Sequence, residues 1–497
     1  MPTITISTAP MSVDDLLAVV DGARVELDAS ATASIAAARA VVDEALAARL
    51  PVYGLTTQVG HGRDVRLTDE EIRGEQEFLV MSHAGGVGPP LPVPVVRAAL
   101  AVRLAGIARG GSGASVAVAE TLVAMLNAGV HPLVPATGSV GASDIAQMAW
   151  IAQVAIGRGR AEHRGDVLPG GEALRRAGIA PLVLGGKDGL ALISANGVSV
   201  GQAALVVTGA ARVAVAADVA AALSMEATEA NPSILHAAVG RAKPIAGQVA
   251  VADHLRELLS GSALLGQHPP RSVQDPLSFR VVPQVHGALR EYVAATRSAV
   301  EAELHAAADN PLVSVPDRAL ISNGNFHPMV LAIACDALRV AVAHVGQLSE
   351  RRLAHLWQAF FQSLSGPPPT RAFGLQLRYP AAALFAELKQ LAAPATLDVP
   401  PQDLDVEDHA TGAPLSVRKT GTAVDLLADL LAVELLLADD VLTAASSPPA
   451  LGAGTGAVRE VVHAAIAAAD PFPDAVHRVL RETFPGTGRV SGAGPGS

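Results

Sequence analysis

The sequence contains few of the residues that support disulfides, thiol chemistry or aromatic packing. There is one cysteine, Cys335, so no disulfide can form within the chain. Its surroundings follow an apolar helical pattern, which is typical of a core residue rather than a nucleophile. Only 3% of the 497 residues are aromatic although 50% are hydrophobic, so Ala, Val and Leu make up the apolar mass. Because Ala and Leu are strong helix formers, this composition predicts close-packed helices.

The sequence also shows no cluster of basic residues and no clear targeting or membrane segment. The net charge is −11 and Lys and Arg never cluster, which argues against nucleic acid as a partner. A secretory signal has a basic segment followed by an apolar one. The first residues, Met-Pro-Thr-Ile, do not show this pattern, so we expect no secretory signal. Residues 121–143 carry no formal charge, but Pro132, Pro135 and several glycines argue against a membrane span. We therefore expect a cytoplasmic protein with no membrane partner.

The periodicity of apolar residues predicts a mainly α protein. Short β-rich pieces occur at residues 4–6 and 24–27. The helices that we expect cover residues 31–48, 70–80, 198–230, 287–308, 329–361, 380–393 and 416–445. These predict a mixed α/β region over residues 1–200, a helical bundle over 201–490 and a disordered Gly/Ser tail over 491–497. Several long helices are apolar around much of their circumference, which predicts a homo-oligomer.

One loop of small residues carries a single charge within a long uncharged stretch. Asp144 is the only formally charged residue between positions 121 and 157, and it ends the run Gly-Ser-Val-Gly-Ala-Ser-Asp at 138–144. A carboxylate in apolar surroundings costs several kcal/mol unless it is paired or caps a helix. The glycines allow the backbone to bend tightly. The sequence therefore predicts a buried, strained and polar loop, which is typical of an active site.

Three other side chains stand at breaks in the helical pattern, and each has two interpretations. Tyr53 precedes a glycine on a loop, where it can act as a general acid or base or simply cap a core. His83 lies beside Gly-rich turns and either lines a pocket or is a structural histidine. Arg280 has apolar neighbours and either holds a substrate carboxylate or forms a salt bridge to Asp275 or Asp309.

Polar residues also cluster in three turns, at 309–311, 322–327 and 407–409. The Glu-Asp-His run of the last turn has residue types that bind metals, but no second histidine follows at i+4 and no cysteine pair exists. We therefore expect no metal site. Turn chemistry and helix caps are the alternative interpretation of these clusters. No phosphate-binding loop, dinucleotide-binding motif or nucleophile elbow is evident.

In this order, the segments resemble the aromatic amino acid ammonia-lyase and aminomutase family, which includes histidine, phenylalanine and tyrosine ammonia-lyases. The family's loop G-S-V-G-A-S-G-D-L-A is similar to residues 138–146, and its V-Y-G-x-x-T-G-F-G to residues 52–60. The other matching segments are L-S-H-A-A-G-V-G at 81–88, K-E-G-L-A-L-x-N-G at 187–197, Q-D-x-Y-S-x-R at 274–280, D-N-P at 309–311, G-N-F-H at 324–327 and E-D-H at 407–409.

The resemblance implies a long-helix bundle of the ammonia-lyase (fumarase/aspartase-like) type and a homotetramer. It also implies an electrophile, 4-methylideneimidazole-5-one (MIO), that the chain makes from its own loop, here Ala142, Ser143 and Asp144. In the family, the amide nitrogen of a glycine attacks the carbonyl two residues earlier and two waters leave. The substrate amine then bonds to this electrophile, which improves the leaving group. No metal and no dissociable cofactor is implied.

The resemblance also assigns roles to single side chains. Tyr53 resembles the base that removes the β-proton, and Arg280 the residue that holds the substrate carboxylate. The residues that match positions around the electrophile and substrate are Asn196, Gln274, Asn310 and Phe326. The residues that match positions facing the substrate side chain are His83 and Glu407, which favours a polar ring such as imidazole or phenol.

The sequence departs from the family at several of these positions. The family's Ala-Ser-Gly-Asp is Ala-Ser-Asp here, so either Asp144 takes the cyclising position or no ring forms. A side chain there hinders the approach of the nitrogen to the carbonyl. Leu277 stands where the family has Tyr, Gln58 replaces a Gly, and two residues are inserted before Asn196. Because these departures cluster at the site while the scaffold motifs persist, they indicate altered chemistry.

The sequence leaves three functions open. The first is an MIO-dependent ammonia-lyase or 2,3-aminomutase that acts on an aromatic or imidazole amino acid through a Tyr base. The second is an MIO-independent enzyme on the same scaffold, running another elimination, addition or isomerisation in specialised metabolism. Both take a small amino acid or a related carboxylate. The third, a non-catalytic homologue, is disfavoured because Tyr53 and Arg280 are retained.

Overall fold

The computed structural model describes residues 2–266, 271–363, 374–446, 449–468 and 477–478. The chain forms two compact units, each gathered from separate stretches of sequence. Unit 1 comprises Met1–Leu205, Arg297–Ile333 and Ala395–Val417, and unit 2 comprises Val206–Thr296, Ala334–Pro394 and Arg418–Ser497. The predicted domains at residues 1–200 and 201–490 stay a prediction, and the predicted tail at 491–497 lies outside the described residues.

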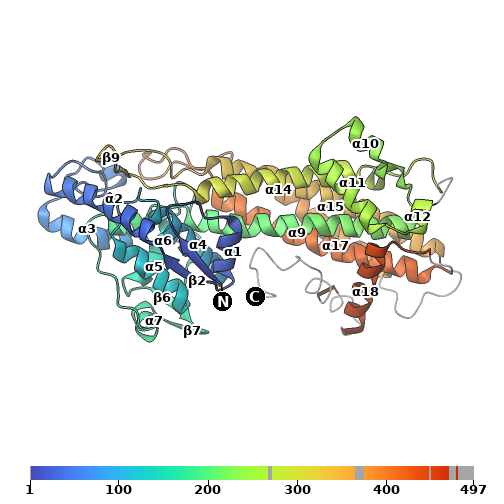
Figure 1. Ribbon diagram of the computed structural model, residues 1–497, viewed down its shortest axis with the longest axis horizontal. Coiled ribbons are helices and arrows are strands. Elements are labelled where there is room, and N and C mark those ends of the chain that lie inside the picture. Colours follow the sequence, from blue (N-terminus) through green and yellow to red (C-terminus); the bar gives the residue numbers. More distant parts are fainter. Residues whose placement is uncertain (1, 267–270, 364–373, 447–448, 469–476, 479–497) are drawn as a thin grey trace. The chain divides into compact units, whose positions relative to one another are not determined.

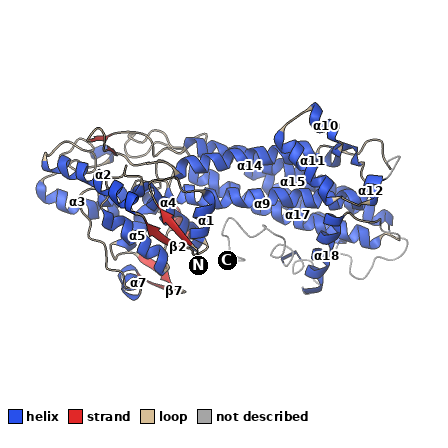
Figure 2. Ribbon diagram, in the orientation of Figure 1, coloured by secondary structure: helices blue, strands red, loops and turns tan. Residues whose placement is uncertain are grey.

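Unit 1 combines helices with short strands, and every strand that the structure describes lies in it (Figures 1 and 2). Its elements are β1 (Thr3–Ile6), α1 (Val13–Val20), β2 (Arg24–Leu27), α2 (Ala29–Ala47), η1 (Gly60–Gly62), α3 (Asp69–Ser82), β3 (Val87–Pro90), α4 (Val93–Ala108), α5 (Val116–Ala128), β4 (Val130–Pro132), β5 (Pro135–Thr137), α6 (Ile145–Ala155), β6 (Arg160–His163), β7 (Asp166–Pro169), α7 (Gly170–Arg176), α8 (Asp188–Ile193), β8 (Leu312–Ser314) and β9 (Ala319–Ile321).

Capping boxes start two helices of unit 1. Ser12 and Asp15 form one at α1, and Thr68 and Glu71 form one at α3. In each, the Ser or Thr oxygen accepts a backbone N–H of the first turn, and the acid accepts the N–H of the capping residue. These bonds satisfy donors that a helix start otherwise leaves unpaired.

The strand pairs of unit 1 bring distant segments together. β1 and β2 pair in parallel, β4, β6 and β7 form an antiparallel sheet, and β8 pairs with β9. β3 pairs with β5, with Val87 opposite Thr137. This last pair matters for the candidate site, because it places the chain just after His83 beside the chain just before Gly138.

All regular secondary structure among the described residues of unit 2 is helical. The helices wholly within it are η2 (Pro232–Leu235), α10 (Ala237–Ala242), α11 (Ala246–Leu258), α12 (Ala263–Gly266), α13 (Leu277–Arg280), α16 (Gly374–Leu391) and α18 (Ala453–Ala468). The boundary between the units falls within the longer helices α9 (Gly197–Thr228), α14 (Val282–Leu304), α15 (Met329–Ser363) and α17 (Ala413–Ala444). The prediction of a mainly α protein with long helices is confirmed.

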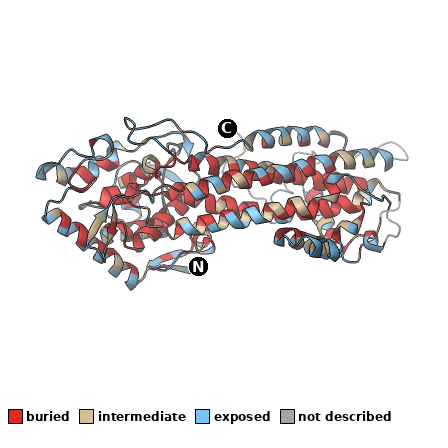
Figure 3. Ribbon diagram, turned by 90° about the horizontal axis from the view of Figure 1, so that it is seen from above, coloured by how far each residue is buried: buried red, intermediate tan, exposed pale blue. Residues whose placement is uncertain are grey.

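The core of unit 2 consists mainly of Ala, Val and Leu side chains from α9, α15 and α17, with further residues from α14, α16 and α18. Figure 3 shows buried residues along the long helices. Small side chains allow helices to approach closely. At Gly287 of α14, for example, a Cβ would lie 2.5 Å from the backbone nitrogen of Gln248 in α11. The composition that favours helices thus also favours their tight packing.

Within the described residues, two helical stretches are long and apolar enough to cross a membrane by length and composition alone, Asp188–Thr228 and Met329–Gln362. The apolar window of the first is 94% buried inside the protein, and that of the second is 56% buried. A core helix passes the same test, and the burial of the first is that of a core helix. Cys335 lies on the second stretch, fully buried, and burial raises the pKa of its thiol to about 12. The prediction that this cysteine is a core residue is confirmed.

Candidate active site

The loop that carries Tyr53 is fixed on α8 by a glutamine. The side-chain amide of Gln76 donates to the carbonyl of Gly54 at 3.1 Å, and its oxygen accepts the N–H of Leu190, also at 3.1 Å. Gly54 has a φ of +62°, and a Cβ there would lie 2.6 Å from Leu190 Cδ2. Only glycine suits this backbone and this contact, so the turn after Tyr53 has a defined shape.

The Tyr53 hydroxyl accepts the backbone N–H of Gly60 at 2.9 Å. Burial raises the pKa of Tyr53, the N–H of Gly60 opposes that rise, and the carboxylates of Glu407 and Asp403 add to it. The phenol is therefore protonated at neutral pH. The Gly60 N–H is nevertheless a donor that can stabilise a phenolate, which is the kind of support that a Tyr base needs.

A second turn carries Glu407 and contacts the Tyr53 loop. Asp403 accepts the backbone N–H of His61 at 2.9 Å and pairs with His61 Nδ1 at 2.7 Å. Gln402 and Glu407 close this turn through two backbone hydrogen bonds of 2.9 and 3.3 Å. Burial, aided by Asp403, raises the pKa of Glu407. Glu407 thus lies on a turn bonded directly to the loop of the predicted base.

The loop at residues 138–144 is strained, and its second half, residues 141–144, is buried. Gly141 and Ser143 have φ angles of +93° and +61°, the second in a region that few residues other than glycine adopt. The hydroxyl of Ser139 donates to the carbonyl of Ser143 at 3.0 Å and accepts the N–H of Gly141 at 3.1 Å. Thr411 donates to the carbonyl of Gly141 at 2.9 Å. Ala142 and Ser143 are 7% and 5% exposed but Val140 is 36% exposed, so the prediction of a buried, strained loop is confirmed for residues 141–144.

The backbone N–H, the backbone carbonyl and the carboxylate of Asp144 all form hydrogen bonds. Its N–H donates to the carbonyl of Ala195 at 2.8 Å, and its carbonyl accepts the N–H of Met148 in α6. Its carboxylate accepts the N–H of Ser199 at 2.7 Å and the Ser199 hydroxyl at 2.9 Å. Because Ser199 lies in the first turn of α9, the carboxylate caps that helix. Complete burial raises the pKa of Asp144, and the bonds from Ser199 oppose the rise.

The carbonyl of Phe326 joins two further parts of the site. It accepts the N–H of Ser143 at 3.2 Å and the side-chain amide of Asn196 at 3.1 Å. The other side-chain atom of Asn196, its Oδ1, is buried without a partner among the described residues. Asn310 completes the group, since its N–H donates to Ser194 at 3.4 Å and its side-chain oxygen accepts the N–H of Asn323 at 3.1 Å.

His83 ends α3 and lies on the segment that β3 places beside the loop. Its Nδ1 is 2.9 Å from the carbonyl of Leu79 and 3.1 Å from the hydroxyl of Ser82. A carbonyl only accepts, so Nδ1 carries a proton, and in the neutral ring Nε2 is then the acceptor. The following chain packs tightly, because a Cβ at Gly138 would lie 3.0 Å from the Cα of Gly86.

Gln274 and Arg280 belong to unit 2, unlike the other predicted site residues. Arg280 is the last residue of α13 and is half-buried, and its guanidinium makes no hydrogen bond or ion pair within the described chain. Asp275 accepts the N–H of Asn231, and Asp309 pairs with Arg103. Neither salt bridge offered as the alternative interpretation is formed, so the guanidinium remains open to an anion.

A buried ion cluster includes Asp309, the residue before Asn310. The sequence analysis did not predict this cluster. Arg103 and Asp309 form two hydrogen bonds of 2.6 and 3.1 Å while only 2% and 0% exposed. Lys187 is fully buried beside them and donates to the carbonyl of Ser112, and burial lowers its pKa to about 8. A lone Arg within the apolar run at residues 98–108 is the signal that could have revealed this cluster.

The side chains of His327 and His409 are in contact, with 2.8 Å between Nε2 of His327 and Nδ1 of His409. No group of three or more His, Cys, Asp or Glu suited to a metal ion occurs among the described residues. The prediction that the site needs no metal stays a prediction.

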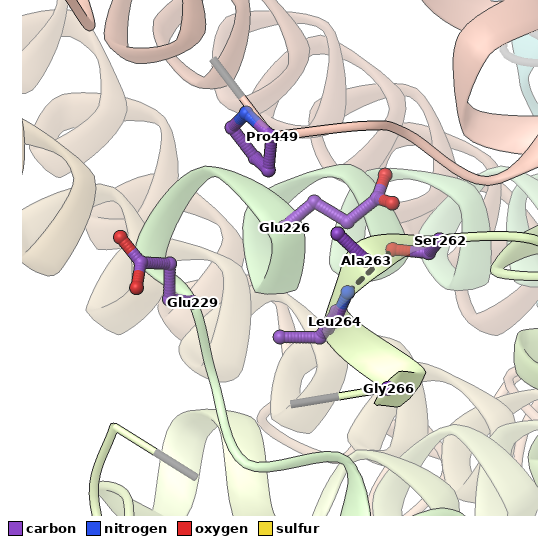
Figure 4. A pocket seen from close by; sticks show the side chains of 7 residues that line it. All are labelled: Glu226, Glu229, Ser262, Ala263, Leu264, Gly266 and Pro449. Atoms are coloured by element: carbon purple, nitrogen blue, oxygen red, sulfur yellow. Dashed lines mark hydrogen bonds between the residues drawn. The ribbon is translucent and has the colours of Figure 1, made fainter. Parts of the chain in front are cut away.

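Unit 2 contains a cavity of about 250 Å³ (Figure 4). Its lining residues are Glu226, Glu229, Ser262, Ala263, Leu264, Gly266 and Pro449. One carboxylate oxygen of Glu226 accepts the N–H of Gly452 at 2.8 Å, and the other is buried without a partner in the described part of the chain. None of the predicted site residues lines this cavity, so it is separate from the candidate active site.

Comparison with known proteins decides the family. The model of the family described as aromatic amino acid lyase matches residues 11–464. The chain belongs to the aromatic amino acid lyase family. This membership makes the chain a carbon–nitrogen lyase or an aminomutase, and the predicted fold class is confirmed with it.

Relatives within the aromatic amino acid lyase family span nearly the whole chain. A histidine ammonia-lyase of Chloroflexus aurantiacus is 39% identical over 440 residues, which are 86% of this chain and 84% of that protein. The solved structure of tyrosine aminomutase from Streptomyces globisporus has a TM-score of 0.89 at 28% identity, covering 98% of this chain and 97% of that one. Ergothionase, an ergothioneine-degrading enzyme from Treponema denticola, has a TM-score of 0.91 at 26% identity, covering 97% and 98%.

The family is known for MIO-type chemistry, but the loop of this chain does not fit the formation of MIO. For Asp144 to take the cyclising position, its nitrogen would have to leave the carbonyl of Ala195 and attack that of Ala142. The same movement would pull the carboxylate from Ser199, and a buried carboxylate without partners costs several kcal/mol. A glycine before Asp144 would supply the nitrogen without disturbing these bonds, and the sequence has none.

Proposed function

We propose that the chain is an ammonia-lyase or 2,3-aminomutase acting on an amino acid with an aromatic or imidazole side chain. The observation that carries this proposal is that the loops of Tyr53, Ser143, Asn196, Phe326 and Glu407 are hydrogen-bonded to one another within unit 1. The relatives named histidine ammonia-lyase and tyrosine aminomutase support the substrate class. A cytoplasmic location is proposed with it.

Turnover of histidine, tyrosine and phenylalanine by the purified protein tests this proposal. A lyase yields a double bond conjugated with the ring, so near-ultraviolet absorbance rises as ammonia is released. An aminomutase yields a β-amino acid, which chromatography separates from the substrate. If none of the three is converted to either product, this function is wrong for the substrates proposed.

Tyr53 moves the β-proton in this proposal. Its hydroxyl is fixed by the N–H of Gly60, and that donor favours the phenolate which must form when Tyr53 acts as a base. His83 and Glu407 recognise the ring of the substrate. The free Nε2 of His83 can accept a hydrogen bond from an imidazole N–H or a phenol O–H, whereas a plain phenyl ring offers no such donor.

Arg280→Lys should weaken substrate binding while the protein stays folded. The lysine keeps the charge but loses the two-pronged contact with a carboxylate. We expect KM to rise on the order of tenfold, since one charge-assisted hydrogen bond is lost. Steady-state kinetics and the melting temperature of the same preparations check this. A KM equal to that of the wild type would remove Arg280 from the carboxylate site.

A homotetramer whose active sites take residues from more than one subunit is the proposed assembly. Light scattering at micromolar concentration should give the mass of four chains, and a stable monomer would contradict it. At substrate concentrations far below the wild-type KM, co-expressed Tyr53→Phe and Arg280→Lys chains should turn over faster than either variant alone, because mixed tetramers then contain sites with both native residues. Tyr53→Phe chains mixed with the Tyr53→Phe, Arg280→Lys double variant serve as the control that should not recover.

A second candidate is an MIO-independent elimination, and the anchoring of Asp144 favours it. Without an electrophile, the substrate nitrogen must depart with no bond to the chain. A nitrogen that is already a trialkylammonium group leaves as a neutral amine once the β-proton is removed. The neighbour named as an ergothioneine-degrading enzyme supports this class, because ergothioneine is a trimethylammonium betaine with an imidazole-derived ring. Release of trimethylamine from ergothioneine, with histidine unchanged, would select this candidate over the first.

A further inference from the structure

Two oxygen atoms beside the 138–144 loop have no partner among the described residues. The Ser143 hydroxyl makes no hydrogen bond there, although the N–H and carbonyl of Ser143 are both bonded. Asn196 is 3% exposed, and its Oδ1 is buried without a partner. Since buried polar atoms are nearly always hydrogen-bonded, an oxygen left over at a candidate active site points to a ligand.

Ser143 and Asn196 are held by the same backbone carbonyl. The carbonyl of Phe326 accepts from both Ser143 N and Asn196 Nδ2, and the carbonyl of Ala195 accepts from Asp144 N. Residues 143–144 and 195–196 are therefore joined by adjacent bonds. The bond to Phe326 also sets the orientation of the Asn196 amide, because a carbonyl accepts only from the nitrogen and the oxygen must face the other way.

Acidic residues lie on the segments next to these oxygens. Asp144 follows Ser143 directly, and the neighbouring turn carries Glu407 and Asp403. An amino acid substrate has one cationic group, its ammonium, which presents three N–H donors. Two oxygen acceptors without partners match that group, and hydrogen bonds from a charged donor are the stronger kind.

We infer that the loop remains an ordinary peptide and that Ser143 Oγ and Asn196 Oδ1 together bind the ammonium group of the substrate. This inference rests on the proposed amino acid substrate and deepens that proposal: the substrate keeps its free ammonium group, which leaves as ammonia without a bond to MIO. Ser143 then serves as an intact hydroxyl, whereas MIO formation would consume that hydroxyl as one of the two waters lost.

Intact-mass measurement of the wild-type protein tests the first half. We expect the mass encoded by the sequence and no near-ultraviolet band of an MIO ring. The control is a variant with one glycine inserted between Ser143 and Asp144, which supplies a cyclising nitrogen and keeps Asp144 on Ser199. This variant should lose the mass of two waters. A wild-type protein lacking two waters overturns the inference, and an insertion variant of encoded mass overturns the reason given for it.

Binding of two matched ligands tests the second half, in a Tyr53→Phe background that suppresses turnover. Histidine and imidazolepropionate differ only in the ammonium group, as do tyrosine and 3-(4-hydroxyphenyl)propionate. Ser143→Ala should weaken binding of the amino acid on the order of 10- to 100-fold and leave the deamino ligand unchanged. Equal weakening of both ligands would assign Ser143 a structural role and overturn the inference. Absence of binding and of turnover for either amino acid would instead sink the proposed function.

Discussion

Tyr53→Phe should abolish most turnover while the protein stays folded. The change removes one hydroxyl and little volume, and the bond lost with the Gly60 N–H is a single one. A general acid or base contributes about 10²–10⁴-fold to a rate, so we expect kcat to fall within that range. Because burial raises the pKa of Tyr53, the wild-type rate should also increase with pH above neutrality, where more phenolate forms. The melting temperature and the pH profile of turnover check both statements.

Tyr292→Phe is the matched control for this experiment. Tyr292 lies on α14 in unit 2 with 45% of its surface exposed, and it is not among the predicted site residues. Tyr292→Phe also removes one phenol hydroxyl, but neither kcat nor its pH profile should change. If Tyr53→Phe turns over the substrate as fast as Tyr292→Phe does, Tyr53 is not the proton-transfer residue.

Asp309→Asn should destabilise the protein strongly. The change leaves the Arg103 guanidinium buried without its counter-charge, next to the buried Lys187. Removing one partner of a buried pair costs about 3–5 kcal/mol, because the remaining charge has lost both water and its ion partner. We expect the free energy of unfolding, measured by denaturant titration, to fall by about that amount. The turn that carries Asn310 follows directly, so substrate binding should weaken as well.

An exposed ion pair supplies the comparison for Asp309→Asn. Arg24 and Glu26 are 2.9 Å apart with more than half of each side chain exposed, so Glu26→Gln should change the unfolding free energy little. If Asp309→Asn is no more destabilising than Glu26→Gln, the buried cluster does not stabilise unit 1 as argued.

The long helices were predictable because apolar periodicity extends over many turns. The expected helix at 198–230 is α9, Gly197–Thr228, and the one at 416–445 is α17, Ala413–Ala444. Two helix starts were wrong. Pro380 lies inside α16, which already includes Gly374, the first residue described after position 363. Packing of Leu377, Ala381 and Leu388 into the core of unit 2 offsets the proline's missing N–H, an effect that local propensity does not capture.

α14 shows a different reason for an early start. The expected helix began at Gly287, whereas α14 begins at Val282. The glycine lies inside the helix because α11 passes so close that a Cβ would meet the backbone of Gln248. A glycine can end a helix, or it can lie inside a helix where a second helix packs closely against it. The sequence does not distinguish these two cases, whereas the fold does.

The sequence predicted those site residues that interrupt an apolar or helical pattern. It could not predict the contacts that backbone groups make. Asp144 was marked by an uncharged stretch, and its carboxylate does cap a helix, one of the two solutions expected for it. Nothing in the sequence marks the carbonyl of Phe326 as the atom that joins Ser143 to Asn196, because every residue has a carbonyl. Ser199 is likewise one serine among many, and its position in the first turn of α9 gives it its role.

The bonds that hold the site loops together have a consequence for the history of such enzymes. The carbonyls of Phe326, Ala195, Gly141 and Val140 accept hydrogen bonds from other loops, and the identity of those four side chains does not enter. A scaffold joined in this way tolerates exchange of the reacting side chains, and even loss of one loop residue, without refolding. New reactions can therefore arise in this lineage by substitution inside a conserved frame, so sequence identity between relatives reports ancestry better than it reports the reaction catalysed.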